Sequence, residues 1–347
     1  MDTIKKTLPG LAVCLGIGAV GWILGKAVPI VGGAVFSLLL GMVVSLFYHP
    51  ESWKGGVRFA SKKILQYGIV LLGFEMNLYR VITVGEKTLI LMMFTLAAAF
   101  ISAFLLSRLL RLPAKLSVLI GVGTAVCGGS AIAATAPAIR ASDEDVARSI
   151  SVIFLFNLAA VFLFPLLGHA LRLSDTGFGI WAGTAVNDTS SVVAAASVWS
   201  QQVGNASALQ IATVVKLTRT LMIIPITLFF SILFSRREKN AAQSDTTEAK
   251  GKAFSFRKVF PWFVLGFLLT SLLYTFLPIP PACGKILVEI GKYLIITAMG
   301  AIGLNTNLKK LFAESKSALL LGLGCWIAVA GTSLLVQFAT GIGAGVA

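Results

Sequence analysis

The sequence predicts an all-helical, polytopic membrane protein with about eleven transmembrane helices (ten or eleven), and three observations support this class. Hydrophobic residues make up 57% of the 347 residues and charged residues only 12%, whereas a soluble protein carries roughly 25% charge. The apolar residues recur in segments of about 20, the length that a helix needs to cross a bilayer. Short charged loops separate these segments, and the alternating strands of about ten residues typical of a membrane barrel are not seen.

Eleven apolar segments follow one another along the chain. They cover residues 8–26, 28–48, 61–79, 87–107, 114–138, 146–168, 176–199, 207–234, 258–278, 284–305 and 317–342. Each is expected to be a helix, because only helices and closed barrels satisfy the backbone in lipid. The polar stretch 235–256 is predicted to be a flexible cytoplasmic loop within a single integral membrane transporter domain spanning 1–347.

The net charge of +15 does not indicate a nucleic-acid partner, because the basic residues lie in loops beside apolar segments. With a cytoplasmic N-terminus, 20 of the 29 Lys and Arg residues fall on the cytoplasmic side, six on the other side and three within spans. This bias is the positive-inside pattern. It predicts a multi-pass protein of the cell inner membrane with a cytoplasmic N-terminus and an extracytoplasmic C-terminus. A homo-oligomer is compatible with this arrangement.

The chain has little that favours metal or cofactor chemistry. Its cysteines form no CxxC pair and its two histidines are far apart, so neither a disulfide framework nor a metal site is expected. No Walker, Rossmann or HExxH motif occurs, and no cofactor is expected. Cys127 and Ser130 have no histidine at comparable depth, so we expect no enzymatic activity.

A row of polar residues interrupts the apolar segment 176–199. An ionisable side chain at the bilayer centre costs at least about 2.5–3.5 kcal/mol, and Asp188 lies ~18 Å into this segment at 1.5 Å per residue. On the next span Lys216 lies ~15 Å deep and Arg219 one turn further. We expect Asp188 to pair with Lys216 or Arg219. The predicted substrate-binding wall adds Asn187, Thr189 and Ser190.

A second unusual stretch, 121–137, carries four glycines and ends in proline. One interpretation is a discontinuous helix whose unwound backbone at Cys127, Gly128, Gly129 and Ser130 presents free N–H groups to an anion. The other is a continuous helix in which small residues allow close packing. We favour the broken helix, because transporters use glycine-interrupted spans in this way.

Four further residues are secondary candidates for the site. Asn157 lies in the middle of the sixth span, where it completes a polar layer or makes one interhelical hydrogen bond. Glu75 and Asn77 lie in LLGFEMNL, and Asn305 lies in the related string AIGLNTNL. Because these two strings end spans that run in opposite directions, they favour an inverted repeat. An alternative register pairs the fifth span with the tenth, and we prefer it because both are expected to be glycine-rich, interrupted spans.

The strings GVGTAVCGGSAIAATAPAI and GTAVNDTSSVVAAA, with LLGFEMNL upstream, resemble the YeiH-type bacterial inner-membrane proteins, a family described as sulfate exporters. The resemblance covers essentially the whole chain in length and span layout. Through a more distant similarity it implies inverted five-helix repeats, crossed broken helices and elevator-like motion, as in bile-acid/sodium symporters and sodium/proton exchangers. Many relatives are expected to have a histidine where this chain has Asn187, so a proton-relay role is not carried over to that position.

The sequence therefore predicts a secondary transporter of a small anion, sulfate or a sulfonate, working by alternating access. Backbone N–H groups, Ser and Thr hydroxyls and a buried cation are the groups that bind an oxyanion. One alternative is an organic-acid transporter coupled to Na⁺ or H⁺, with Asp188 as the coupling group. Another is a channel or a non-transporting membrane scaffold, in which the polar row only joins helices.

Overall fold

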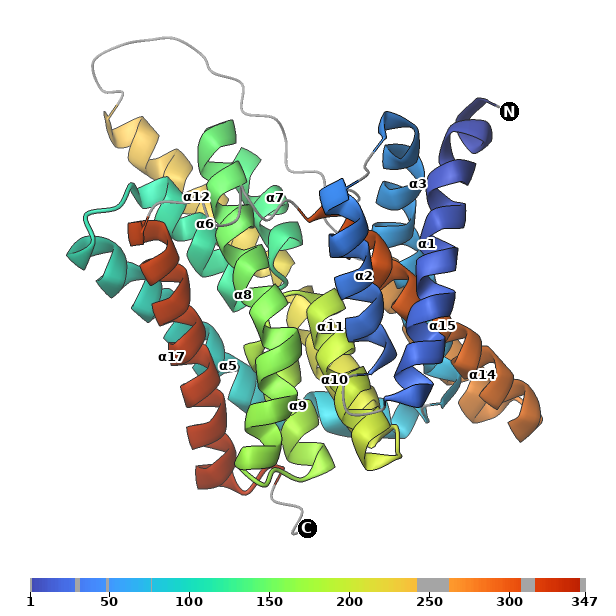
Figure 1. Ribbon diagram of the computed structural model, residues 1–347. Helices are drawn as coiled ribbons and strands as arrows, with labels where there is room; N and C mark the ends of the chain where they lie inside the picture. The colour runs from blue at the N-terminus through green and yellow to red at the C-terminus, as the bar shows by residue number, and fades with distance from the viewer. Residues whose placement is uncertain are drawn as a thin grey trace.

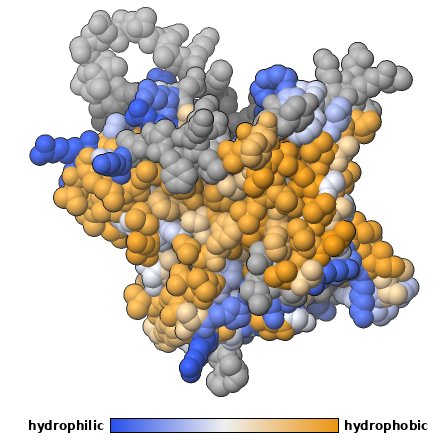
Figure 2. All heavy atoms as spheres, viewed as in Figure 1, coloured by the Kyte–Doolittle hydropathy of each residue, from blue (hydrophilic) through white to orange (hydrophobic). Residues whose placement is uncertain are grey.

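The computed structural model describes residues 2–28, 32–47, 50–75, 77–241, 262–306 and 316–343, and all regular secondary structure in these ranges is helical. Figure 2 shows a broad apolar band between two polar ends, as expected for a protein embedded in lipid. Within these described ranges, six helical segments are long and apolar enough to cross a bilayer. These are Thr7–Ala27, Val81–Leu109, Glu144–Ala170, Ser207–Phe234, Pro281–Asn305 and Lys316–Thr340.

One group of helices, here called the panel, occupies the right half of Figure 1. Within it α15 packs against α1, α2 and α4. A Cβ added at Gly41 would overlap the carbonyl of Gly300, so the small residues let α2 and α15 approach backbone to backbone. The panel consists of α1 (Asp2–Ala27), α2 (Gly33–Phe47), η1 (Glu51–Trp53), α3 (Lys54–Phe59), the π-helical turn η2 (Ala60–Ile64), α4 (Leu65–Leu72), η3 (Gly73–Glu75), α14 (Trp262–Phe276) and α15 (Pro281–Asn305).

The second group, here called the core, contains the remaining helices and lies on the left and in the centre of Figure 1, although α5 begins beside α14 of the panel. It consists of α5 (Leu78–Leu109), α6 (Ala114–Ala125), α7 (Gly129–Ala138), α8 (Asp143–Ala170), α9 (Asp175–Ala185), α10 (Thr189–Val203), α11 (Ser207–Leu221), α12 (Ile223–Ala241) and α17 (Lys316–Thr340). Because α12 continues to Ala241, the first residues of the predicted loop 235–256 are helical; residues 242–256 lie outside the described ranges.

Panel and core meet chiefly where α10 packs against α2 and α15. The packed surface is apolar and combines small residues, Ala34 of α2 and Ala194 of α10, with larger aliphatic ones such as Leu38 and Ile296. At its edge the backbone N–H of Gly33 donates a hydrogen bond of 3.1 Å to Oε1 of Gln201. The helix α10 is therefore the main element that joins the two groups.

The segment 114–138 does not cross the bilayer, because it folds back on itself. Nζ of Lys115, at the start of α6, donates a hydrogen bond of 2.8 Å to the carbonyl of Arg140, just after α7. A straight helix would separate these residues by ~37 Å at 1.5 Å per residue. Halfway up, a Cβ on Gly123 would lie 2.9 Å from the Ile132 side chain. The expected crossing is wrong, and α6 and α7 form a first re-entrant hairpin.

The segment 176–199 folds back in the same way. Near its start, Asp175 accepts hydrogen bonds from Nε1 of Trp199 at 2.8 Å and from Nδ2 of Asn205 at 2.7 Å, so it contacts residues at the far end of α10. Phe178 stacks on Trp199 with ring centroids 4.1 Å apart, and His169 of α8 stacks on the opposite face. The predicted crossing here is also wrong, and α9 and α10 form a second re-entrant hairpin.

The two hairpins enter the molecule from opposite ends. In Figure 1 the first lies in the upper half and the second in the lower half, while α1 begins at the top and α17 ends at the bottom. Arg140 and Arg148 therefore move to the side of the N-terminus, and Arg172 moves to the other side. The split of basic residues, 20 to 6 for eleven crossings, becomes 21 to 5. The hairpins therefore agree better with the positive-inside rule than the crossings they replace.

Candidate functional site: the meeting point of two hairpin tips

The tips of the two hairpins meet inside the core. A Cβ built on Gly128, in the first tip, would lie 3.2 Å from Cβ of Asp188 in the second tip and 3.5 Å from Nδ2 of Asn157. Asn157 lies in the middle of α8, between the hairpins in sequence. The structure thus brings Gly128, Asp188 and Asn157 together, as the sequence predicts for a polar layer.

The first tip is the interruption between α6 and α7, so the broken-helix interpretation of 121–137 is correct. Gly128 adopts φ +67°, a left-handed conformation that an L side chain rarely adopts. It provides no side-chain cap for α7, and the first N–H groups of a helix have no partner within the helix. A Cβ on Gly129 would meet nothing within 4 Å, and Ser130 is exposed. The positive end of α7 therefore faces open space.

The second tip breaks the segment at Val186–Asp188, where a continuous helix was expected. Asp188 is the N-cap of α10: its carboxylate accepts hydrogen bonds from the backbone N–H of Ser190 at 3.0 Å and from the Ser190 hydroxyl. The backbone N–H of Asp188 donates to Oδ1 of Asn157 at 3.0 Å. Asn157 therefore makes the interhelical hydrogen bond foreseen for it and holds the second tip against α8.

Lys216 of α11 joins the two tips. Its ammonium group is fully buried and donates to the carbonyl of Val126 at 2.7 Å and to the carbonyl of Val186 at 2.9 Å. These carbonyls follow the last residues of α6 and α9, where helix ends carry unpaired acceptors and a partial negative charge. One cation thus neutralises the ends of both half-helices.

Arg219, one turn further along α11, does the same with three donors. Its Nη2 donates to the carbonyl of Thr124 at 2.7 Å, its Nε to Ala125 at 2.6 Å, and its Nη1 to Thr184. The side chain is fully buried. A buried guanidinium with all three nitrogens bonded to carbonyls satisfies the helix ends that would otherwise be left without partners.

The predicted ion pair between Asp188 and Lys216 or Arg219 is not formed. Among the described residues, the ion pairs seen are Lys54–Glu51, Arg148–Glu144 and Lys292–Glu289, all involving exposed partners. The physical reason is the chain breaks: two helix C-termini supply five carbonyls that take up the cations. Asp188 in turn is occupied with capping α10.

An internal repeat, missed in the sequence, explains this symmetry. Residues 123–136 and 183–196 are identical at seven of 14 positions, and both begin with GTAV. Lys216 binds the carbonyls of the equivalent residues Val126 and Val186. Arg219 likewise binds those of Thr124 and Thr184. The repeat therefore pairs the fifth segment with the seventh. The preferred register, which paired the fifth with the tenth, loses its basis because α15 is one continuous helix.

The remaining candidates differ in their relation to the tips. Asn187 is only 1% exposed, and neither amide atom has a hydrogen-bond partner among the described residues. Cys127, Thr189 and Ser190 are buried at the tips.

The secondary candidates near the helix ends make local contacts. Asn77 caps α5 by accepting from the Tyr79 N–H at 2.8 Å, and Asn305 donates to Ser61 at 3.4 Å. Neither contact includes a residue of the tips. The backbone of Glu75 belongs to η3, but its side chain lies outside the described part of the chain.

A helical membrane protein with two opposed re-entrant hairpins, joined at their tips by two buried cations, is the class that this fold and site define. A family model described as "Conserved hypothetical protein 698" matches residues 9–322. A UPF0324 membrane protein of Streptococcus pyogenes serotype M18 is 47% identical over 99% of this chain and 100% of its own length. One from Fusobacterium nucleatum is 44% identical over 98% and 100%, respectively. The chain belongs to the UPF0324 family of membrane proteins, as the resemblance to YeiH-type proteins predicts.

Proposed function

We propose that the protein is a secondary transporter of a small anion, sulfate or a sulfonate, and that the anion binds at the first turn of α7. The observation that carries this proposal is the uncapped N-terminus of α7 at the meeting point of the hairpins, with open space at Gly129 and an exposed Ser130. Helix N-termini bind anions through free N–H groups and the helix dipole. The Ser130 hydroxyl adds a further donor.

The charges around the tips favour an anion as well. Lys216 and Arg219 contribute two positive charges and Asp188 one negative charge, which leaves a net charge of about +1 near the tips. Because both cations are bound to carbonyls, they support the anion through their field and do not need to contact it. In a site poorly screened by water this field acts over several ångströms.

The second hairpin supports a coupling role. Asp188 is half-buried, and the adjacent Asn187 has an amide oxygen without a hydrogen-bond partner among the described residues. The carboxylate can bind a proton or contribute to a Na⁺ site, and the amide oxygen is a further ligand for Na⁺. A transporter that couples the anion to Na⁺ or H⁺ is therefore the second candidate, and its flux depends on the gradient of that cation.

The division into panel and core supports alternating access. The panel–core interface formed by α10 with α2 and α15 is apolar, so the core can slide against the panel without breaking a polar network larger than the hydrogen bond between Gly33 and Gln201. We place nine crossings and two hairpins in the bacterial inner membrane, with the N-terminus in the cytoplasm. An odd number of crossings puts the C-terminus outside.

The test is flux in proteoliposomes. Sulfate, sulfite, thiosulfate, short alkyl sulfonates and dicarboxylates are supplied with imposed Na⁺ or pH gradients. A saturable flux of one of these anions is expected. It should be lost in Gly129→Ala and Ser130→Ala, variants that fill the open space or remove the hydroxyl without touching the buried cations. Flux that does not saturate points to a channel. Full flux in both variants would refute the site.

A further inference from the structure

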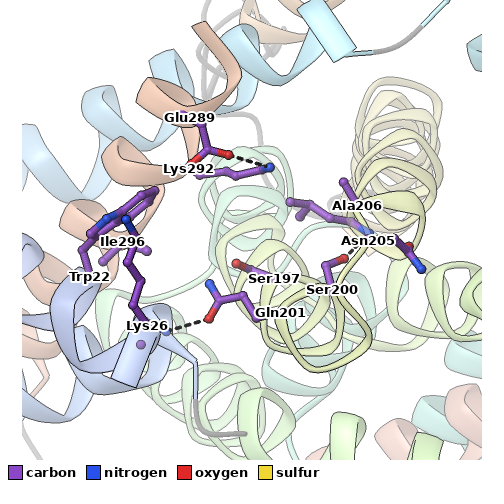
Figure 3. A pocket seen from close by; sticks show the side chains of 14 residues that line it. Trp22, Lys26, Ser197, Ser200, Gln201, Asn205, Ala206, Glu289, Lys292 and Ile296 are labelled. Carbon is purple, nitrogen blue, oxygen red and sulfur yellow. Dashed lines mark hydrogen bonds and ion pairs between the residues drawn. The ribbon is translucent and has the colours of Figure 1, made fainter. Parts of the chain in front are cut away.

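A cavity of about 490 Å³ lies apart from the tips, where the lower end of the second hairpin meets the panel. Figure 3 shows its lining. Trp22 and Lys26 come from α1, Ser197, Ser200 and Gln201 from α10, Asn205 and Ala206 from the loop after it, and Glu289, Lys292 and Ile296 from α15. The volume is within the range of small-molecule sites. The cavity spans the boundary across which panel and core move in the proposed transport cycle.

The charged groups of this cavity are two lysines and one glutamate. Nζ of Lys292 lies 3.1 Å from Oε1 of Glu289, and Nζ of Lys26 lies 5.2 Å from the centroid of the Trp22 ring. One lysine is thus neutralised by a neighbour and the other rests on an aromatic face. The lining carries a net charge of +1, which favours an anion.

The polar groups of α10 add hydrogen-bond donors. Oε1 of Gln201 accepts from the Gly33 N–H, so the amide nitrogen is the half of that side chain left for a ligand. In Figure 3 Ser197 and Gln201 point into the same space as the Lys292 side chain. Trp22 and Ile296 add apolar surface beside the charges. An acidic group next to a short apolar part fits this combination.

The cavity is connected to the tips by one face of α10. Ser197 and Gln201 follow Ser190 by seven and 11 residues. These spacings place all three on the same side of a helix with 3.6 residues per turn. Ser190 contacts Asp188 at the tip, and Gln201 lies ~16 Å further along the helix. The cavity is therefore the outer end of a stripe of polar residues on α10 that begins at the tip of the second hairpin.

We propose that this cavity is an outer docking site for a small organic anion, such as a short alkyl sulfonate. Lys26 and Lys292 attract the acidic group, and Trp22 with Ile296 contacts the apolar part. That the docked anion is on its way to the tips rests on the proposed transport function. Binding in the cavity does not rest on the transport function, because it can be measured without any flux.

The experiment uses charged thiol reagents on the purified full-length protein in neutral detergent. Cys283 is the exposed cysteine, whereas Cys14, Cys127 and Cys325 are buried. Ser200→Cys is therefore made in a Cys283→Ser background. Its reaction rates with sulfonatoethyl and trimethylammonioethyl methanethiosulfonate are compared as a ratio. The same ratio at Cys283 of the unchanged protein is the reference for an exposed thiol outside the cavity.

The anionic-to-cationic ratio at Ser200→Cys is expected to exceed the reference by about threefold, the effect of one net charge roughly 6 Å away in salt. Combining Lys26→Gln with Lys292→Gln leaves only Glu289 and should bring the ratio below the reference, whereas Glu289→Gln should increase the excess. Lys285→Gln is the matched control, because Lys285 lies on the same helix but does not line this cavity. An unreactive alkyl sulfonate should slow modification by either reagent.

A ratio equal to the reference, or one that survives loss of both lysines, would overturn the docking site, as would an equal loss in Lys285→Gln. Protection by the sulfonate together with no anion flux in proteoliposomes would keep the docking site and refute the transport function. Flux without protection would do the reverse. The two proposals therefore fail separately.

Discussion

The two hairpins share their first halves and differ in their second halves. Each first half ends in GTAV, and the carbonyls of both are held by Lys216 and Arg219. The second half of the first hairpin begins at Gly128, in a left-handed conformation and without a side-chain cap. The second half of the other hairpin begins at Asp188, whose carboxylate caps α10.

This difference gives the two kinds of helix end at the tips different roles: one kind supports the hairpins, and the other can bind a ligand. The negative helix ends are neutralised by the protein's own cations, so both hairpins have the same support. Of the two positive ends, one is satisfied by Asp188 and the other is left open beside Gly129. An open positive end is where an anion gains most from binding, whereas a capped end with a half-buried carboxylate suits a coupling cation.

Arg219→Met is expected to have the largest effect, because it removes the support common to both hairpins. Three buried carbonyls lose a charged donor, which should lower the free energy of unfolding by about 3–5 kcal/mol. Denaturant titration in mixed micelles measures this change. Arg219→Lys should recover only part of it, since an ammonium group cannot reach all three carbonyls. A loss below 1 kcal/mol in Arg219→Met would show that the tips do not depend on this side chain.

Lys216→Met should have the next largest effect, about 2–4 kcal/mol, because two buried carbonyls lose their donor. The same titration applies, with Lys285→Met on the surface of α15 as the control. Combining Lys216→Met with Arg219→Met should cost less than the sum of the single effects, because both side chains hold the same two tips. Additive losses would mean that the hairpins are supported independently.

Gly128→Ala tests the first tip alone. A left-handed φ of +67° should cost alanine about 1–2 kcal/mol, and its Cβ would lie 3.2 Å from that of Asp188. Gly129→Ala is the matched control for stability, because its methyl group meets open space and helical alanine is preferred to glycine. Stability should therefore fall only in Gly128→Ala, while anion flux falls in both. Equal stability of the two variants would contradict the assigned tip geometry.

The smallest change in stability is expected for Asp188→Asn, which keeps a capping oxygen for α10 but removes the negative charge. Asparagine caps helices about as well as aspartate, whereas alanine costs about 1 kcal/mol. Asp188→Asn should thus keep the unfolding free energy within a few tenths of a kcal/mol but abolish cation-coupled flux. Asp188→Ala should lower the free energy of unfolding by about 1 kcal/mol and also abolish cation-coupled flux. Coupled flux that survives in Asp188→Asn would limit this residue to capping.

The polar layer was predictable from the sequence, but its internal contacts were not. Depth estimates placed Asp188 level with Lys216 and Arg219, and the tips do meet at these residues. The predicted ion pair of Asp188 with Lys216 or Arg219 was wrong, because counting charged residues considers only side chains as partners. Backbone carbonyls become partners once a helix ends, and the GTAV repeat at 123–126 and 183–186 was the signal that two helices end in the same way.

The apolar segments, their order and their polar interruptions were determined by the sequence alone, because burial in lipid demands about 20 apolar residues whatever the partners. Whether the segments 114–138 and 176–199 cross or return was decided only by the tertiary structure. The half-helices α6 and α7, of 12 and 10 residues, have the same amino-acid composition whether the segment crosses the bilayer or returns. Contacts between distant residues, Lys115 with Arg140 and Lys216 with both tips, hold the chain in the returning path.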